Sequence, residues 1–394
     1  MKQVLAVYIF LFSLISFGQV KVNYVLIDKK MDAIPTSFSN STDLIGKYIT
    51  ENFKTEDDKI RAAFYWTASN IKYDVDNMFD VNINETSQER IAKTLKTKTG
   101  ICVDYANIFN NIVNAVGMKS VVVSGYTKQN ERVDGLSHAW CAAKVDNKWY
   151  LFDPTWGTGY INNKDKKYTR NTNKSFFKID PEIMIYSHMP FDYLWQFMDY
   201  PLTNKEFIDG VVVGDETKQK FDFVKEIARL ESLSKKEQYS ESSQRIKKNG
   251  MKNQFISQAY VNAINHLNYE TNIENRNKFN EIINQKNQAD SQYKEYIQYY
   301  KKQFLPTLPD DEIKRMLQEP KEKLAKCLVA VSDFEKTESA SSNQVNIDNL
   351  KKSISQILEK IELNLQFVNL YLSKPKAVRK TMFYTVVKTT KKTN

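Results

Sequence analysis

The chain has 394 residues, of which 41% are hydrophobic and 12% aromatic. This length exceeds that of one average domain, so two or three domains are expected, and the composition excludes an intrinsically disordered chain. The formal net charge is +10, from 57 Lys and Arg against 47 Asp and Glu. The basic residues are scattered along the chain and form no block, so we expect no nucleic-acid partner.

The first residues have the pattern of a secretory signal peptide. Lys2 supplies a positive charge, residues 4–17 form an apolar run, and Gly18 offers a small residue for cleavage. The run is too short for a membrane anchor, and no later stretch reaches the roughly 18 apolar residues of a membrane span. We therefore expect residues 1–18 to be removed and the chain to be exported to the periplasm, the cell surface or the medium, with no integral membrane span.

Helices are predicted ahead of strands in the first half of the chain. Helical spacing of apolar residues predicts three helices, over residues 57–70, 88–95 and 103–117. Segments rich in β-branched residues predict three strands, over residues 120–126, 138–145 and 148–153. This order indicates an α+β domain, which we place at residues 40–207 after an N-terminal segment at 19–39.

The region at 216–394 differs in composition. Gly250 is its only glycine, and Glu, Lys, Gln and Asn dominate. Apolar residues that recur every three or four positions from Ile347 to Val368 predict a long amphipathic helix. We expect a mostly α-helical C-terminal domain that ends in a strand near 382–387, and we assign no chemistry to it.

The chain has three cysteines, an odd number for an oxidising compartment, so at least one thiol should stay unpaired or pair between molecules. A free cysteine is either a buried small hydrophobe or a nucleophile. Cys327 fits the first role, because apolar residues at helical spacing surround it. Cys102 fits the second, because it lies at the start of the predicted 103–117 helix, where unpaired N–H groups and the helix dipole favour a thiolate. The Cys102 amide can also stabilise an oxyanion.

The register of a predicted hairpin indicates which histidine can act as the general base for Cys102. If residues 146–147 form a two-residue turn, the cross-strand pairing places His138 opposite Thr155. Asp153 then lies two residues along on the same face, within reach of the imidazole. This spacing predicts a Cys102-His138-Asp153 triad in which Asp153 orients the base.

Cys141 has the opposite parity to His138 in the same strand, so its side chain should point away from the predicted triad. A disulfide between Cys102 and Cys141 is therefore disfavoured. We expect Cys102 to remain accessible to thiol reagents without prior reduction.

Several motifs of the chain resemble the transglutaminase-like superfamily, and most closely its bacterial and kyphoscoliosis-peptidase-like branch. They are TGICVDYA at 99–106, VVSGY at 122–126, SHAW at 137–140 and WYLFDPTWG at 149–157. The resemblance covers roughly residues 40–207. It implies a papain-like fold, in which a helix bearing the nucleophile packs on an antiparallel sheet, and it makes the matching Cys, His and Asp the nucleophile, base and orienter. Relatives often carry Asn at the position of Cys141, which faces away from the triad.

The second oxyanion donor is not given by the resemblance, because branches of the family differ there. Trp66 and Tyr73 are candidates for that donor, and Trp140 is a candidate for the groove. The tryptophans of the hairpin region can line an acyl groove, but such residues more often belong to the core. His188 belongs to a downstream motif of the family, and we interpret it as a packing and hydrogen-bonding residue.

No metal or cofactor is expected. The three histidines are widely spaced, no Cys-x-x-Cys motif is present to bind zinc, and no glycine-rich phosphate loop occurs.

The sequence thus predicts an exported cysteine-nucleophile enzyme that cleaves amide or peptide bonds of a protein or peptide through a thioester. Discharge of the thioester by water would make it a peptidase or amidase, and discharge by a lysine amine would make it a transglutaminase. The alternative is a catalytically silent binding module at the cell surface. In either case the helical C-terminal domain is the candidate site for a cell-envelope partner.

Overall fold

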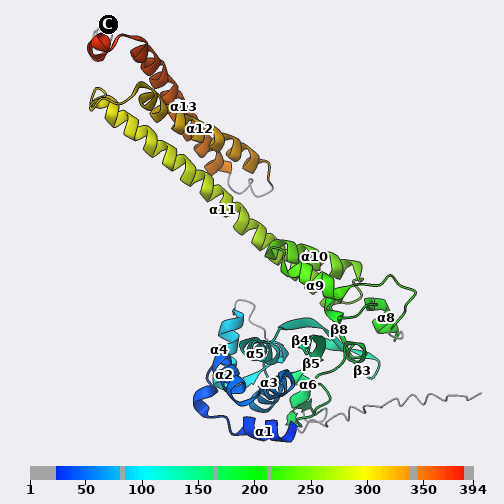
Figure 1. Cartoon of the computed structure of the whole chain (residues 1–394). Coiled ribbons are helices and arrows are strands. Elements are labelled where there is room, and N and C mark those ends of the chain that lie inside the picture. Colours follow the sequence, from blue (N-terminus) through cyan, green and yellow to red (C-terminus); the bar gives the residue numbers. More distant parts are fainter. Residues whose placement is uncertain (1–23, 80–84, 163–166, 211–213, 338–343, 386–394) are drawn as a thin grey trace, which may run out of the picture. The chain divides into compact units, whose positions relative to one another are not determined.

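The computed structural model describes residues 24–79, 85–162, 167–210, 214–337 and 344–385 (Figure 1). The expected signal peptide lies outside these residues. The chain divides into two compact units: the first consists of the residues up to Leu233 together with Ser240–Ala263, and the second of Ser234–Tyr239 together with the residues from Ile264 onward. Among the described helices, none is both long and apolar enough to cross a membrane.

An antiparallel sheet with the strand order β5-β4-β3-β8 forms the centre of the first unit. Its strands are β3 (Ser120–Gln129), β4 (Arg132–Val145), β5 (Lys148–Phe152) and β8 (His188–Pro190). The first three confirm the predicted strands. The edge strand β8, which comes from much further along the chain, was not predicted.

Helices cover one face of the sheet. They are α1 (Tyr24–Asp32), α2 (Thr42–Asn52), α3 (Glu56–Asn70), α4 (Ser87–Thr97) and α5 (Cys102–Ala115). Alternate residues of β4, namely Ala139, Cys141 and Ala143, share an apolar core with α3 and α5. The predicted helices correspond to α3, α4 and α5. The α+β class, with the helix that begins at Cys102 packed on an antiparallel sheet, is confirmed.

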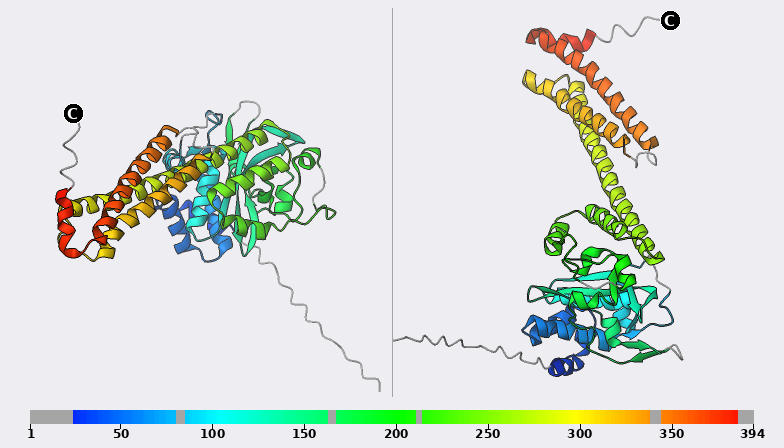
Figure 2. Two further views of the ribbon diagram at one scale, coloured as in Figure 1. Left: turned by 90° about the horizontal axis from the view of Figure 1, so that it is seen from above. Right: turned by 90° about the vertical axis from the view of Figure 1, so that its right-hand side faces the viewer.

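The opposite face of the sheet carries a second layer. Trp140 and Ala142 point to this side and pack with Leu194, Ile227 and Leu230 of η2 (Tyr193–Gln196) and α9 (Phe223–Glu231). Figure 2 shows the sheet between α9 and the N-terminal helices.

Short elements complete the first unit. They are η1 (Thr36–Phe38), the parallel pair β1 (Lys72–Tyr73) and β2 (Thr99–Gly100), α6 (Pro154–Thr158), the hairpin of β6 (Gly159–Ile161) and β7 (Tyr168–Arg170), α7 (Pro181–Met184) and α8 (Asn204–Asp209).

The first unit extends beyond the composition change near residue 216. Ile246 of α10 (Lys235–Lys248) and Ile256 of α11 (Gln254–Lys301) join an apolar core with Tyr126 of β3. Arg245 of α10 also forms a buried ion pair, at 2.8 Å, with Asp192 beside η2. The helical composition therefore begins before the first compact unit ends.

The second unit is helical. From residue 264 onward, α11 packs with α12 (Asp310–Glu335) and α13 (Gln344–Ser373), and α13 buries Ile347, Ile354 and Ile361 along one side, as its periodicity predicts. Cys327 is fully buried in this core. The chain continues into η4 (Lys376–Thr381) and α14 (Met382–Thr385).

The terminal strand predicted at 382–387 is wrong where the structure describes it, because α14 occupies its first four residues. Phe383 packs there against the rings of Phe304 and Phe367, at centroid distances of 5.4 and 5.7 Å. Contact with this aromatic cluster outweighs the β-propensity of the segment. The rest of the predicted strand lies outside the described residues.

Candidate active site

Cys102 is the first residue of α5, as the sequence predicts. The carboxylate of Asp104 accepts the Ile101 N–H at 2.8 Å and pairs with Arg90 at 2.8 Å, which closes the start of the helix. The amides of Cys102 and Val103 lie ahead of the intrahelical hydrogen bonds and are available to a ligand. Gly100 is required beside them, since a Cβ there would lie 2.7 Å from the Cβ of Asp104.

The β4–β5 hairpin has the predicted register. Asp146 and Asn147 both have positive φ angles, of 49° and 66°, as in a type I′ turn, and Val145 pairs with Lys148. Asp153 follows the last residue of β5. The pairing thereby sets Asp153 on the face that carries His138.

His138 and Asp153 meet at the end of this hairpin. The Nε2 atom of His138 lies 2.7 Å from Oδ2 of Asp153, which is fully buried. The other carboxylate oxygen, Oδ1, accepts the backbone N–H groups of Thr155 and Trp156 at 2.8 and 3.1 Å, so Asp153 also caps α6. These bonds fix the carboxylate, and the carboxylate fixes the imidazole.

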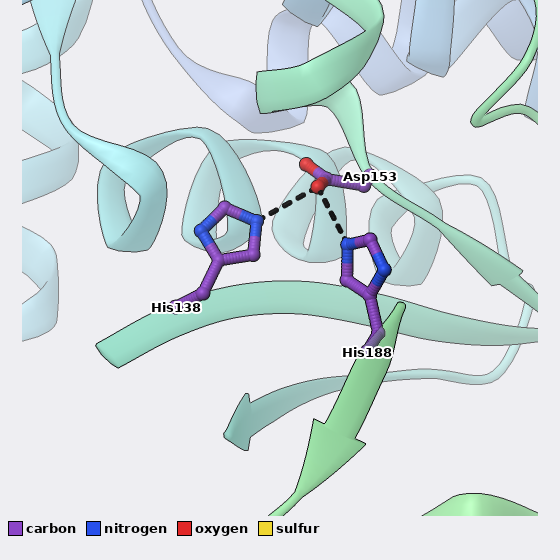
Figure 3. Close-up of side chains that lie close together, drawn as sticks. All are labelled: His138, Asp153 and His188. Carbon is purple, nitrogen blue, oxygen red and sulfur yellow. Dashed lines mark hydrogen bonds and ion pairs between the residues drawn. The ribbon is translucent and has the colours of Figure 1, made fainter. Parts of the chain in front are cut away.

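His188 of β8 is a second imidazole on the same carboxylate (Figure 3). Its Nε2 lies 3.1 Å from Oδ2 of Asp153, and its Nδ1 lies 2.7 Å from the Ser187 hydroxyl. The expected hydrogen-bonding role is confirmed, but its partner was not foreseen. The sequence offers one sign of this role, the position of His188 in the downstream motif. It does not reveal Asp153 as the partner, because nothing in it shows that β8 pairs with β3.

The three groups differ in protonation. Burial lowers the pKa of His138, but the Asp153 carboxylate and the Cys102 thiol raise it more, so this pKa lies well above its usual range. Burial raises the pKa of the Asp153 carboxyl, but both imidazoles lower it further, to below its ordinary value. Burial lowers the pKa of His188, and Asp153 offsets only part of this effect. These directions favour a charged His138, an ionised Asp153 and a neutral His188.

Cys102 and His138 face one cavity. Cys102 contributes to raising the pKa of His138, and because Nε2 of His138 is engaged by Asp153, Nδ1 is the nitrogen available to the thiol. Cys102 is partly exposed, whereas Cys141 is buried and directs its thiol to the Ala106 carbonyl at 3.2 Å. All three cysteines are free, in agreement with the expectation that Cys102 and Cys141 do not pair.

The cavity beside Cys102 has a volume of about 590 Å³, within the usual range for ligand sites. Aromatic side chains form much of its wall: Tyr73, Trp156, Tyr160, Tyr168 and Phe176. Strand β4 contributes Asp134, Gly135, Leu136, Ser137 and His138. The cavity can therefore hold an extended apolar or peptide group against the nucleophile.

Tyr73 is the oxyanion candidate that the structure places at the cavity. Burial and the nearby charges of Cys102 and Asp153 raise the pKa of its phenol, which keeps the hydroxyl protonated as a donor. Trp66 instead lies fully buried in the core of the first unit and does not line the cavity.

The tryptophans of the hairpin region have different positions. Trp140 is buried and stacks on the His138 ring at 6.1 Å, so it supports the base rather than lining the groove. Trp149 is a core residue packed on Phe197. Trp156 lines the cavity and contacts the His188 ring at 4.5 Å.

The described residues contain one group with the composition of a metal site. His138, Asp153 and His188 each bring a ligand atom within 4.8 Å of the others. Both histidine Nε2 atoms are hydrogen-bonded to Oδ2 of Asp153, and Asp153 and His188 are buried, so each of these atoms has a partner without an ion. The geometry fits a hydrogen-bonded cluster.

Comparison with known proteins agrees with the motifs. Residues 44–154 match the transglutaminase-like superfamily. Kyphoscoliosis peptidase from Mus musculus is 30% identical over 156 residues, which cover 38% of this chain and 23% of that protein. Its Homo sapiens counterpart is 28% identical over 178 residues, which cover 44% and 26%. The chain thus spans about a quarter of the length of these relatives. A crystal structure of a TGase is 20% identical with a TM-score of 0.24, covering 41% of this chain and 40% of that chain.

Proposed function

We propose, from the match of residues 44–154 to the transglutaminase-like superfamily and from the site built around them, that the chain is a cysteine-nucleophile enzyme acting on amide or peptide bonds. The observation that supports this proposal is that Cys102 and His138 line one cavity, with the buried Asp153 carboxylate 2.7 Å behind the imidazole. The kyphoscoliosis peptidases are much longer than the matched region, so the proposal rests on the site of this chain and not on the activity of those proteins.

The first half of the proposed reaction forms a thioester. The Cys102 thiolate attacks the carbonyl carbon of an amide, and the oxyanion receives hydrogen bonds from the Cys102 amide and the Tyr73 hydroxyl. His138, held as an imidazolium by Asp153, gives its proton to the leaving amine as the C–N bond breaks.

The second half discharges the thioester. Water or an amine attacks the acyl carbon, His138 takes its proton, and the Cys102 thiolate leaves. Water gives hydrolysis and a lysine amine gives transamidation. We favour hydrolysis, which requires only access of water to the cavity.

We also propose that the enzyme is exported. The positive residue Lys2 and the apolar run at 4–17 support this proposal. The helical second unit is available to contact a cell-envelope partner.

An assay on a protein substrate tests the proposed reaction. The full chain is incubated with casein and a fluorescent primary amine, and new N-termini and incorporated amine are both measured. We expect one of these products with the wild type and with Cys327→Ala, and neither with Cys102→Ala. Equal product from Cys102→Ala would contradict the proposal, and the absence of product from every protein would favour the silent binding module.

A further inference from the structure

The cavity beside Cys102 carries an uneven charge. Among the described residues that line it, Asp134 is the only acidic side chain, and no Lys or Arg is present. The chain as a whole has ten more basic than acidic residues. Apart from the His138 imidazole of the site itself, Asp134 is therefore the charged side chain that the described lining of this cavity offers to a ligand.

Asp134 is held in place from the neighbouring strand. Thr127 donates its hydroxyl to Oδ2 at 2.5 Å, and Gln129 donates its amide to the same oxygen at 3.1 Å. Thr127 is buried and is paired with His188 across β3 and β8. The carboxylate is thus fixed by the strand that also positions the second imidazole of the site.

The fixed carboxylate keeps accepting capacity for a ligand. The hydrogen bonds that Asp134 accepts from Thr127 and Gln129 both reach Oδ2. A carboxylate oxygen accepts more than one hydrogen bond, and Oδ1 has its full capacity left. A cationic group in the cavity would find an acceptor in Oδ1.

Aromatic rings line the same cavity as this carboxylate. Trp156, Tyr160 and Phe176 form the cavity wall together with Asp134, and Tyr160 is more than half exposed at 54%. Aromatic faces attract ammonium and guanidinium groups, and the attraction adds to that of a carboxylate. The combination is typical of a site for a positively charged side chain.

We propose that Asp134 and this aromatic wall form a subsite for a lysine or arginine side chain, so that the preferred substrates are peptides with a basic residue beside the reacting carbonyl. The inference rests on the proposed function for the reaction itself. The charge selectivity of the cavity can be measured without turnover.

The test uses two thiol reagents of opposite charge, trimethylammonium-ethyl and sulfonatoethyl methanethiosulfonate. In each reaction the Cys102 thiolate attacks the sulfenyl sulfur, a mixed disulfide forms and a sulfinate leaves. Rates at Cys102 are measured by mass spectrometry on the full chain at low salt. We expect the ratio of the cationic to the anionic rate to fall about fivefold in Asp134→Asn, the effect of one charge near the reacting sulfur.

Two controls keep the result specific. Glu131→Gln removes an exposed charge in the β3–β4 turn that does not line the cavity, and Asp134→Glu retains the charge; both should keep the wild-type ratio. An unchanged ratio in Asp134→Asn, or an equal fall in Glu131→Gln, would overturn the inference. A failure of the proposed function would show in a different measurement. The rate of reaction at Cys102 would then be the same in the wild type and in His138→Ala.

Discussion

Replacement of His188 tests how the second imidazole supports the site. His188→Phe preserves an aromatic ring against Trp140 and Trp156, which lie at 5.1 and 4.5 Å, but removes the N–H group facing Asp153. His188→Gln retains an N–H donor and loses part of the packing. The pair of variants therefore separates hydrogen bonding from packing.

The expected size of the effect follows from the burial of Asp153. Its carboxylate is fully buried, and withdrawing one donor from a buried acceptor costs about 1–3 kcal/mol. If this free energy is lost from the orientation of His138 in the transition state, kcat/KM drops about tenfold to hundredfold, with KM little changed. His188→Gln should stay within a few-fold of the wild type.

The pH profile gives a readout that packing alone would not move. His188 helps to lower the pKa of Asp153, so its removal raises this pKa and shifts the acidic limb of the kcat/KM profile to higher pH. The assay is peptide cleavage by each variant across the acidic range, beside its thermal unfolding. A His188→Phe enzyme with wild-type kcat/KM and an unmoved acidic limb would refute a positioning role, as would an equal defect in His188→Gln.

Three further predictions concern the scaffold. A Cβ on Gly125 would lie 2.1 Å from a β8 carbonyl oxygen, so Gly125→Ala should lower the melting temperature and the activity. A Cβ on Gly135 would meet nothing within 4 Å, so Gly135→Ala should leave the melting temperature unchanged. Arg245→Met breaks the buried ion pair with Asp192 and should lower the free energy of unfolding in urea by about 3–5 kcal/mol. Lys236→Met removes an exposed ion pair and should lower it by at most about 1 kcal/mol. Similar losses in the two variants would contradict the packing of α10 in the first unit. Because the pKa of His138 is raised in the folded protein, its protonation stabilises the folded state. This contribution to the free energy of unfolding is complete below about pH 6.5 and is lost as the pH rises through the folded-state pKa. Urea titrations should show this alkaline loss of stability in the wild type and a smaller loss in His138→Ala.

The hairpin and the meeting of His138 with Asp153 could be predicted because short-range rules determine them. A two-residue turn at Asp146 and Asn147 fixes the register, and the period-two alternation of strands then decides which side chains share a face. The start of a helix at Cys102 is likewise visible in the periodicity that follows it. These features need no knowledge of distant segments.

The remaining features depend on contacts between distant segments. His188 reaches Asp153 only because β8 pairs with β3 after a long stretch with little regular structure. Trp66 was a candidate oxyanion donor, but the face of α3 that carries it packs into the core. The terminal strand is wrongly predicted at its described residues because an aromatic cluster formed by several helices packs against Phe383 in a helix. Local pattern carries no information about such partners.

The reactivity of Cys102 tests the central claim most directly. The rate of alkylation by iodoacetamide is measured against pH for each of the three thiols by mass spectrometry, in the wild type, in His138→Ala and in His266→Ala as a histidine control outside the site. A thiolate paired with the His138 imidazolium predicts that Cys102 reacts fastest at and below neutral pH, and that this rate falls on the order of tenfold in His138→Ala alone. If Cys102 reacts no faster than an ordinary thiol, and equally in all three proteins, the cysteine-nucleophile account is contradicted.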